Sequence, residues 1–409
     1  MRFLLLTQYF PPEVGASQVR LGAVARALKQ YGHDVEIVTA LPNYPTGRIL
    51  PGYRGHFYVL DNFHGIPVHR VWIYPAVGAG LRRLINYGSF VATSLVGLFR
   101  SQRPEYVFVE SPPLFLALPG AFAAAQWKAG MILNVADLWP DSVEQLRVLQ
   151  GGVLLDLARR LEKWAYHRAT FVNAVTESIR RTLTERKGVP PEKVLFLPNG
   201  VDPEEFKPMA PDAQLMRELG IGNKKIILYA GTLGFAHGLD VILRAFVYWK
   251  EGVRQVEVLF VGDGPDRKRL QTLSMELGLD NVRFVPPQSH EVIAKLYGIS
   301  YAGITTQKNL PLLEGNRPAK IPVIMACGKP VIFSGSGEAA RLIESAQSGI
   351  VVPPEDPEAL ATAMRELVDN PAWAEKLGQN GRRYVEEKLS WSVLIKDWLR
   401  QLHERSGCI

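Results

Sequence analysis

Short apolar runs alternate with helical stretches along the whole chain, and this alternation limits the possible folds more than any other feature. Continuous apolar runs of roughly four to eight residues are typical of strands that helices cover on both faces of a parallel sheet. Helices are expected between the strands, for example at Gln18–Gln30 and Leu154–Ala169. The strands expected in the first half are Arg2–Leu6, Val35–Thr39, Tyr106–Val109, Met131–Val135, Phe171–Val175 and Val194–Leu197.

The same pattern starts again in the second half of the chain, where the expected strands are Lys225–Tyr229, Val256–Val261, Val282–Val285, Ala302–Thr305, Pro330–Phe333 and Gly349–Val352. A hydrophobic core rarely grows beyond about 250–300 residues, so a chain of 409 residues favours two domains. We therefore predict an α/β fold with two doubly wound, Rossmann-like parallel-sheet domains, at residues 1–197 and 223–370. Residues 198–222, which are rich in Pro, Asp and Glu, are predicted to be a linker. Residues 371–409 are predicted to be helices that pack back across the domain boundary.

Open parallel sheets bind their ligands in the loops at the carboxyl ends of the strands. Two such sheets that face each other would form a cleft lined by these loops from both halves. The functional residues are therefore expected in the loops that follow the strands.

The net charge of +7 favours a polyanionic partner, such as nucleic acid, anionic lipid or a diphosphate. No basic patch with interleaved aromatic residues supports nucleic acid, so we expect none. The longest apolar stretch, Leu84–Phe99, contains polar residues and is shorter than the roughly 20 residues that span a bilayer. The two cysteines, Cys327 and Cys408, cannot build a cysteine metal site and indicate a thiol-reducing, cytoplasmic compartment.

Two glycine-containing loops stand directly before expected helices. Gly15 and Ser17 precede the first helix, and Gly231-Thr232-Leu233-Gly234 follows the first strand of the second half. The start of a helix presents free backbone N–H groups to a phosphate or a sugar hydroxyl, although Ser17 could equally be an ordinary helix cap. The repetition of the arrangement favours a diphosphate ligand.

A third glycine loop, with Gly262 and Gly264, gives weaker evidence. Arg267 stands where a dinucleotide fingerprint would have its third glycine. A tight turn between a strand and a helix therefore explains these two glycines better than a direct pyrophosphate site.

The segment from Lys308 to Lys320 carries the densest group of charged residues in a loop that opens a helix. Arg317 offers a bidentate fork to phosphate oxygens, Lys308 and Lys320 offer point charges, and Glu314 suits sugar hydroxyls. Functional residues lie disproportionately on such loops, which favours a binding role over solvated decoration.

The sequence contains no Asp-x-Asp dyad, and its eight histidines lack the spacing of metal ligands. We therefore expect no metal and no cofactor. A bound diphosphate would be neutralised by protein cations and helix ends.

Six motifs, spread over the chain, resemble those of retaining GT-B glycosyltransferases of family four, and more closely the bacterial branch that builds O-antigen, capsule and exopolysaccharide. They are Tyr9-Phe-Pro-Pro-Glu-Val-Gly15, Pro42-Asn-Tyr-Pro-Thr-Gly47, Asp137-Leu-Trp-Pro-Asp141, Leu197-Pro-Asn-Gly-Val-Asp202, Gly262-Asp-Gly-Pro265 and Ala326-Cys-Gly-Lys-Pro330. The resemblance implies metal-independent transfer with retention, from a UDP- or GDP-linked sugar to a lipid-linked or saccharide acceptor.

The resemblance also implies a role for individual residues. The catalytic group would be Asp137, Glu314, Arg317 and Lys320. The acceptor would lie near Gly15, Ser17, Asn43 and Tyr44, and the donor near Gly231, Thr232, Gly234, His237, Gly262, Gly264, Val285, Gln288 and Lys308.

Three positions depart from the pattern of the family. Val323 stands where the wider family has a Glu that holds the ribose, Ala136 replaces a basic residue, and His237 replaces a phosphate-binding Lys. Two alternatives therefore stay open, a sugar-nucleotide epimerase of the same fold and a non-catalytic partner in polysaccharide assembly. Nucleotide release on mixing with donor and acceptor would separate the transferase from both.

Arg82 and Arg83 precede the apolar stretch Leu84–Phe99. A helix of this kind can lie in the membrane interface with its cations on anionic headgroups, which predicts a peripheral protein on the inner face of the cell membrane. A core helix under the first sheet is the competing explanation.

Overall fold

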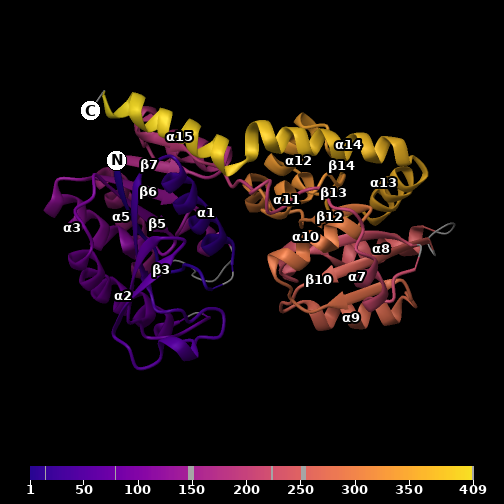
Figure 1. The fold of residues 1–409 in the computed structure, drawn as a ribbon, viewed down its shortest axis with the longest axis horizontal. Coiled ribbons are helices and arrows are strands. Elements are labelled where there is room, and N and C mark those ends of the chain that lie inside the picture. Colours follow the sequence, from indigo (N-terminus) through magenta and orange to yellow (C-terminus); the bar gives the residue numbers. More distant parts are fainter. Residues whose placement is uncertain (14, 79, 146–151, 223, 250–254, 408–409) are drawn as a thin grey trace. The chain divides into compact units, whose positions relative to one another are not determined.

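The computed structural model describes residues 1–13, 15–78, 80–145, 152–222, 224–249 and 255–407 (Figure 1). The chain divides into two compact units, one made of Met1–Asn199 and Leu394–Ile409, the other of Gly200–Val393. The segment that we expected to be a linker, 198–222, thus belongs mostly to the second unit, because Phe206 and Ile221 are buried in the core of that unit.

The first unit contains a sheet in the order β3-β4-β2-β1-β5-β6-β7-β8, in which all neighbouring strands are parallel except β3 and β4. Its strands are β1 (Arg2–Leu6), β2 (Asp34–Ala40), β3 (Tyr58–Phe63), β4 (Ile66–Val71), β5 (Tyr106–Ser111), β6 (Gly130–Val135), β7 (Phe171–Ala174) and β8 (Val194–Phe196). The helices of this unit are α1 (Ala16–Gln30), α2 (Leu81–Arg100), α3 (Ala117–Trp127), α4 (Asp141–Gln145), α5 (Val153–Arg168) and α6 (Glu177–Glu185), with short 3-10 turns at η1 (Pro51–Tyr53), η2 (Leu114–Leu116) and η3 (Pro191–Lys193).

The antiparallel hairpin β3–β4 at the edge of the first sheet is absent from the strands that we expected. In β3, exposed and partly buried residues alternate, because only one side of this edge strand is covered. A search for continuous apolar runs therefore misses it. The turn, from Asn62 to Gly65, closes when the Gly65 N–H donates to the Asn62 side chain at 2.8 Å.

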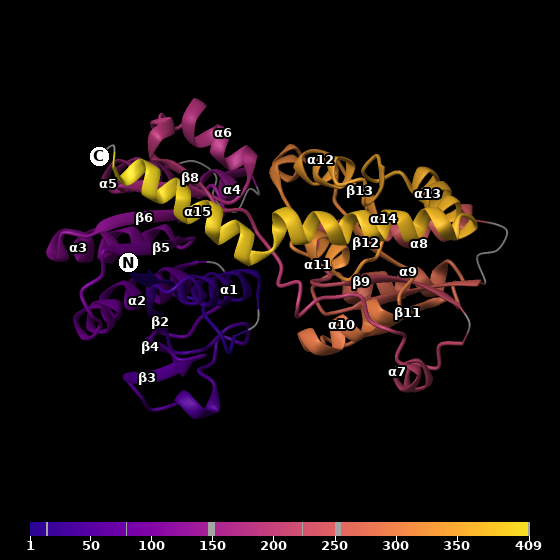
Figure 2. The ribbon, with the colours of Figure 1, turned by 45° about the horizontal axis from the view of Figure 1, so that its top comes forward.

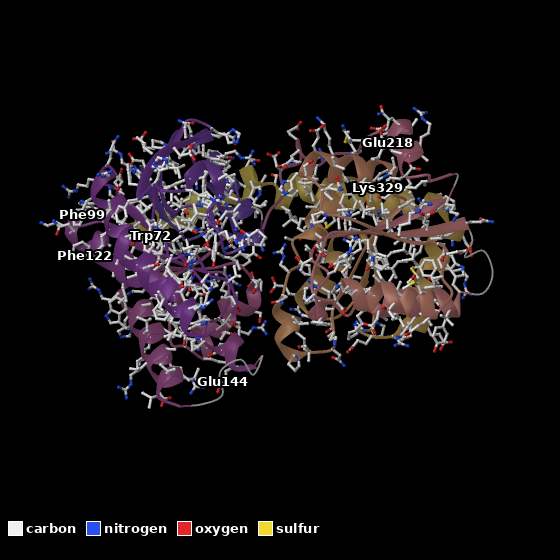
Figure 3. The ribbon with its side chains drawn as sticks, turned by 90° about the horizontal axis from the view of Figure 1, so that it is seen from below. Trp72, Phe99, Phe122, Glu144, Glu218 and Lys329 are labelled. Atoms are coloured by element: carbon white, nitrogen blue, oxygen red, sulfur yellow. The ribbon has the colours of Figure 1, made fainter. Side chains whose placement is uncertain are left out.

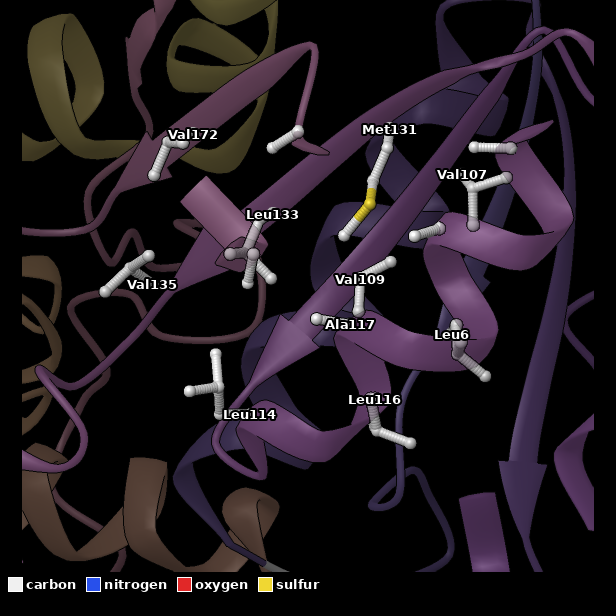
Figure 4. Close-up of a cluster of buried hydrophobic side chains, with 14 of the residues drawn as sticks. Leu6, Val107, Val109, Leu114, Leu116, Ala117, Met131, Leu133, Val135 and Val172 are labelled. Carbon is white, nitrogen blue, oxygen red and sulfur yellow. The ribbon is translucent and has the colours of Figure 1, made fainter. Parts of the chain in front are cut away.

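Alternate residues of each strand face opposite sides of the first sheet. Leu6, Val109, Met131 and Leu133 pack on one side against α2, α3 and α5 (Figure 4). On the other side, the buried ring of Trp398 contacts Phe3 and Phe108, both at 6.0 Å between ring centroids. Trp398 lies on the last helix, α15 (Trp391–Ser406), which reaches the first unit at Leu394 (Figure 2).

The second unit contains a fully parallel sheet in the order β11-β10-β9-β12-β13-β14. Each of its strands overlaps one that the apolar runs predicted: β9 (Lys225–Ala230), β10 (Val256–Val261), β11 (Val282–Val285), β12 (Ala302–Thr306), β13 (Val331–Ser334) and β14 (Gly349–Val352). The helices are α7 (Ala213–Glu218), α8 (Asp240–Tyr248), α9 (Arg267–Glu276), α10 (His290–Ile299), α11 (Lys320–Ala326), α12 (Glu338–Ser345), α13 (Pro357–Asp369) and α14 (Pro371–Tyr384), with further turns at η4 (Phe235–His237), η6 (Pro311–Gly315) and η7 (Val385–Leu389).

Both faces of the second sheet are covered. One face packs against α8, α9, α13 and α14, and the other against α10, α11 and α12. Because helices cover both faces, the strands of this sheet are mostly apolar along their length. The first sheet, apart from its hairpin, is built in the same way, so both units have the doubly wound architecture that the sequence predicted.

No helix in the described ranges is long and apolar enough to cross a membrane. Cys327 is buried in the second unit, where burial raises the pKa of its thiol to about 12. Cys408 lies outside the described residues.

Candidate active site

In the second unit, two glycine loops meet at the carboxyl ends of β9 and β10. The Gly231 N–H donates to the Val261 carbonyl at 2.9 Å, and the Leu233 N–H donates to the Asp263 carbonyl at 2.9 Å. A Cβ atom at Gly262 would overlap the Gly231 carbonyl oxygen, and one at Gly264 would overlap that of Leu233. These glycines are therefore required for the close approach of two backbones, which the tight-turn explanation did not include.

Lys320 extends from the start of α11 to the first of these loops. Its Nζ donates to the Tyr229 hydroxyl at 3.0 Å and lies 4.6 Å from the centre of the Tyr229 ring. The Tyr229 hydroxyl in turn donates to the Thr232 carbonyl at 2.6 Å. Burial lowers the pKa of Lys320 from 10.5 to about 8. In the described part of the chain, Lys320 forms no ion pair with a carboxylate.

His237 lies next to Lys320. Burial and, to a lesser extent, the charge of Lys320 together lower the pKa of its imidazole to about 4. At neutral pH the side chain is therefore uncharged, unlike the Lys that the family resemblance led us to expect here. The loop is held from β12, because Thr306 donates to the His237 carbonyl and the Lys308 N–H donates to the Ala236 carbonyl at 3.1 Å.

The remaining donor-site residues lie around these loops. The Gly262 N–H donates to the Val285 carbonyl at 3.1 Å, which places the end of β11 beside the glycine loop. Arg267 braces this junction, since its guanidinium donates to the Gly262 carbonyl at 2.6 Å. Gln288 is partly buried and donates to the Pro286 carbonyl, while Thr232 is exposed beside Gly231 and Gly234.

Arg317 and Glu314 occupy the loop before α11, close to the carboxyl end of β13. The Arg317 Nη1 atom lies 4.0 Å from Glu338 Oε1, and both side chains are at most 10% exposed. Glu338 begins α12 after Gly337, where a Cβ atom would overlap the backbone of Glu314. Glu314 itself is exposed. The structure thus brings Arg317 against Glu338, a partner that we did not predict.

In the first unit, Glu13 connects the loops that follow β1 and β2. Its carboxylate accepts hydrogen bonds from the backbone N–H groups of Asn43 at 2.7 Å and Tyr44 at 2.8 Å. Tyr44 is 40% exposed, whereas Asn43 is buried and donates to the Leu41 carbonyl. The side chain of Asn43 therefore shapes this loop instead of facing solvent. Gly15 caps α1, and Ser17 donates to the Gln18 side chain at 3.0 Å.

Asp137 follows β6 and is partly buried. Desolvation is the largest influence on its carboxyl and raises its pKa, while a hydrogen bond with Ser142 opposes the shift. The neighbouring Asp141 is paired instead with Lys187, at 2.8 Å, and Lys187 also pairs with Glu162. Ala136, which departs from the family pattern, packs against the core of the first unit.

Arg83 does not face solvent as its neighbour Arg82 does. It donates to the Tyr9 hydroxyl, to the Ala76 carbonyl at 2.9 Å and to Asn86 Oδ1 at 3.0 Å. Its guanidinium thus belongs to the loop region around Tyr9, which corrects our assignment of Arg83 to lipid headgroups.

Several residues of these loop regions were missed in the sequence. Tyr229 lies within a buried strand and gives no local signal, whereas Tyr9 begins one of the six motifs but was given no role of its own. The Gly335-Ser336-Gly337-Glu338 segment could have been found, because it follows a strand and opens a helix like the two glycine loops that we singled out.

Comparison with known proteins agrees with this architecture. Residues 15–200 match the family model of the glycosyl transferase 4-like domain, and residues 212–384 match that of the glycosyl transferases group 1. A relative named as the colanic acid biosynthesis glycosyl transferase WcaI of Escherichia coli (strain K12) is 28% identical over 418 residues, which cover 98% of this chain and 100% of the relative.

Two solved structures are similar in fold. Sucrose-phosphate synthase from Thermosynechococcus elongatus has a TM-score of 0.75 and 19% identity, over 100% of this chain and 99% of that chain. Anabaena HepE in complex with UDP-glucose has a TM-score of 0.73 and 19% identity, over 99% of this chain and 100% of that chain. With both units matched by glycosyltransferase models and with this fold, the chain belongs to the GT-B glycosyltransferases of family four.

Proposed function

We propose that the chain transfers a sugar, with retention, from a nucleotide-sugar donor on the second unit to a lipid-linked or saccharide acceptor on the first unit, in the synthesis of a surface polysaccharide. The single observation that carries the proposal is Lys320, a partly buried ammonium group at the meeting point of two glycine loops. Its described contact is a neutral hydroxyl, so the site has an unneutralised cation where a diphosphate would bind.

The geometry suits a reaction that depends on stabilising a leaving group. The bond between the sugar carbon and the donor phosphate oxygen breaks, and a bond from the same carbon to the acceptor oxygen forms. The departing diphosphate gains negative charge as the bond to the sugar carbon breaks, and the proton of the acceptor hydroxyl, which it takes up, then offsets that charge. Lys320 and the backbone N–H groups of Thr232 and Gly234 would stabilise that charge, since those of Gly231 and Leu233 donate to backbone carbonyls. We therefore expect no requirement for a metal or a cofactor.

The positions of four further residues in the second unit assign them contacts with the donor. Val285 and Gln288 would contact the nucleotide beside Gly262 and Gly264, and Lys308 would add positive charge near His237. Glu314, which is exposed on the same loop as Arg317, would contact hydroxyls of the donor sugar. The name of the Escherichia coli relative supports polysaccharide synthesis, and the complex of HepE with UDP-glucose supports a UDP-linked donor.

A membrane-bound acceptor is supported by one face of the first unit. Leu81, Leu84 and Ile85 on α2 are 73%, 45% and 46% exposed. Phe99 on α2 and Phe122 on α3 are 61% and 47% exposed, and their rings contact each other at 6.0 Å (Figure 3). Residues 62–104 contain no Asp or Glu. Apolar side chains with cations and without carboxylates favour an anionic lipid surface.

The test is a thermal-shift screen of UDP, GDP and ADP, followed by assay of nucleotide release from the matching nucleotide sugar. One nucleotide should raise the melting temperature of the wild type and of Lys268→Ala, an exposed control on α9, but not of Lys320→Ala. Stabilisation of all three proteins alike, or of none, would contradict the donor site. An epimerase would convert the donor without an acceptor, and a non-catalytic partner would release no nucleotide.

A further inference from the structure

Five aromatic rings form two neighbouring groups at the carboxyl end of the first sheet, and Arg83 joins the groups into one row. Tyr9 and Tyr44 meet at 5.7 Å between ring centroids, Tyr87 and Phe115 at 5.9 Å, and Phe115 and Trp139 at 5.7 Å. The rings come from separate segments, namely the loops after β1, β2, β5 and β6 and the second turn of α2. No local sequence pattern produces this row.

Arg83 joins the two halves of the row. Its guanidinium carbon lies 4.5 Å from the centre of the Tyr87 ring and 5.8 Å from that of Tyr9. The hydrogen bonds to Ala76, Asn86 and the Tyr9 hydroxyl hold the guanidinium between the rings. Burial raises the pKa of Tyr9 to about 12, so its phenol stays protonated at neutral pH. These contacts join Tyr9 and Tyr87 through Arg83.

Part of each ring is accessible to solvent. Tyr44 is 40% exposed, and Tyr9, Tyr87, Phe115 and Trp139 are partly exposed. Pyranose rings carry an apolar face of C–H groups and a rim of hydroxyls, which suits aromatic faces flanked by polar groups. Such groups are present in the Tyr9 hydroxyl and in the partly buried carboxyl of Asp137, two residues from Trp139.

The length of the row indicates the size of the ligand. The contributing strands lie side by side in the order β2-β1-β5-β6. Neighbouring strands are about 4.8 Å apart, so four strands extend over about 15 Å, which is longer than one sugar ring. We infer that the row formed by Tyr44, Tyr9, Tyr87, Phe115 and Trp139 binds the saccharide part of the acceptor, and that this part contains at least two sugars. The inference rests on the proposed transferase function.

The experiment uses an array of immobilised mono- to tetrasaccharides of glucose, galactose, mannose, fucose and N-acetylglucosamine, probed with the full-length protein. Wild type should bind disaccharides or longer chains at least ten-fold more tightly than the matching monosaccharides. Trp139→Leu and Tyr87→Leu should each weaken this binding about 10-fold, the size of one aromatic contact. Trp164→Leu, at a 38% exposed tryptophan of α5, is the matched control and should bind like the wild type.

Trp139 packs partly against the core, so its variant needs a check by thermal melting. If it does not fold, Tyr44→Leu replaces it, because this exposed ring contributes little to the core. The inference is overturned if no saccharide binds, if monosaccharides bind equally well, or if the folded variants bind like the control.

The saccharide array tests the aromatic row and the donor assay tests the transferase, so each experiment can contradict its own hypothesis without the other. Release of nucleotide from a nucleotide sugar without binding to any saccharide would overturn the aromatic row and leave the transferase in place. Saccharide binding without use of any nucleotide sugar would overturn the proposed function and leave the binding row.

Discussion

At the scale of single residues, the ammonium group of Lys320 should control donor capture through its charge. Its pKa of about 8 means that the free protein loses this charge as the pH rises through 8. We expect kcat/KM for the donor to fall above about pH 8, because kcat/KM reports the free enzyme. Lys320→Arg should keep its charge and abolish this decline, whereas Lys320→Ala should lower kcat about 10²–10³-fold.

The lowered pKa of Lys320 should reduce donor capture at high pH, but it changes the stability of the fold in the opposite direction. The unfolded chain holds the Lys320 proton up to its ordinary pKa of 10.5, whereas the folded chain releases it near 8. The Lys320 contribution to the free energy of unfolding therefore rises between these pH values. A donor-capture profile that stays flat in wild type, or declines equally in Lys320→Arg, would contradict the assignment.

Arg317 should behave differently from Lys320, although the two are three residues apart. The sequence predicted a phosphate-binding role for Arg317, but the side chain lies against Glu338 and both are nearly buried. Removing one partner of a buried pair typically costs about 3–5 kcal/mol, although the 4.0 Å separation favours the lower end. Chemical denaturation should show a clear decrease in the free energy of unfolding for Arg317→Ala and almost no decrease for Arg317→Lys. Equal stability of Arg317→Ala and wild type would contradict the pairing.

At the scale of elements, α2 presents two faces with separate tasks. Leu81, Leu84 and Ile85 are exposed, whereas Asn86 and Phe90 are buried. We expect the protein to sediment with phosphatidylglycerol vesicles more than with phosphatidylcholine vesicles, and less as salt rises. A Leu84→Ser, Ile85→Ser double variant and Arg82→Glu should each weaken sedimentation several-fold.

The control for the vesicle experiment is Arg181→Glu on α6, where the arginine is 73% exposed and lies 4.0 Å from Glu185. It reverses the same charge on another helix of the same unit. Arg83 is left unchanged, since its contacts with Tyr9 and Asn86 belong to the loop region. If Arg181→Glu reduces sedimentation as much as the α2 variants do, net charge alone explains the binding. If no variant reduces sedimentation, α2 is an ordinary surface helix.

At the scale of the whole molecule, the last helix, α15, packs into the core of the first unit. Trp398 is fully buried, packs on Phe3 and Phe108, and donates to Asn173 Oδ1 at 3.0 Å. Trp398→Ala should destabilise the protein by about 3–5 kcal/mol through the cavity and the loss of the donor to Asn173 Oδ1. Trp373→Ala, at a 40% exposed tryptophan of α14, should change stability by about 0.5 kcal/mol or less. Urea denaturation followed by circular dichroism measures both, and similar values would contradict the role of α15.

The sequence by itself determined the fold class and the loops of the second unit. The strands of the second sheet are buried on both faces, so their apolar runs stand out against the helices between them. The glycine loops at Gly231, Gly262 and Gly264 were also recognisable in the sequence, but the close approach of two backbones that requires glycine at 262 and 264 appears only in the structure.

Only the tertiary structure decided which side chains meet. The five aromatic residues of the row are far apart in the chain, and the strand order β2-β1-β5-β6 brings them together. Arg82 and Arg83 are neighbours in sequence, yet a helix turns by about 100° per residue, so one faces solvent and the other the loop region. Local sequence patterns indicate which side of each segment is buried. Contacts between segments depend on strand order and on helix rotation, and these are determined by the packing of the whole unit.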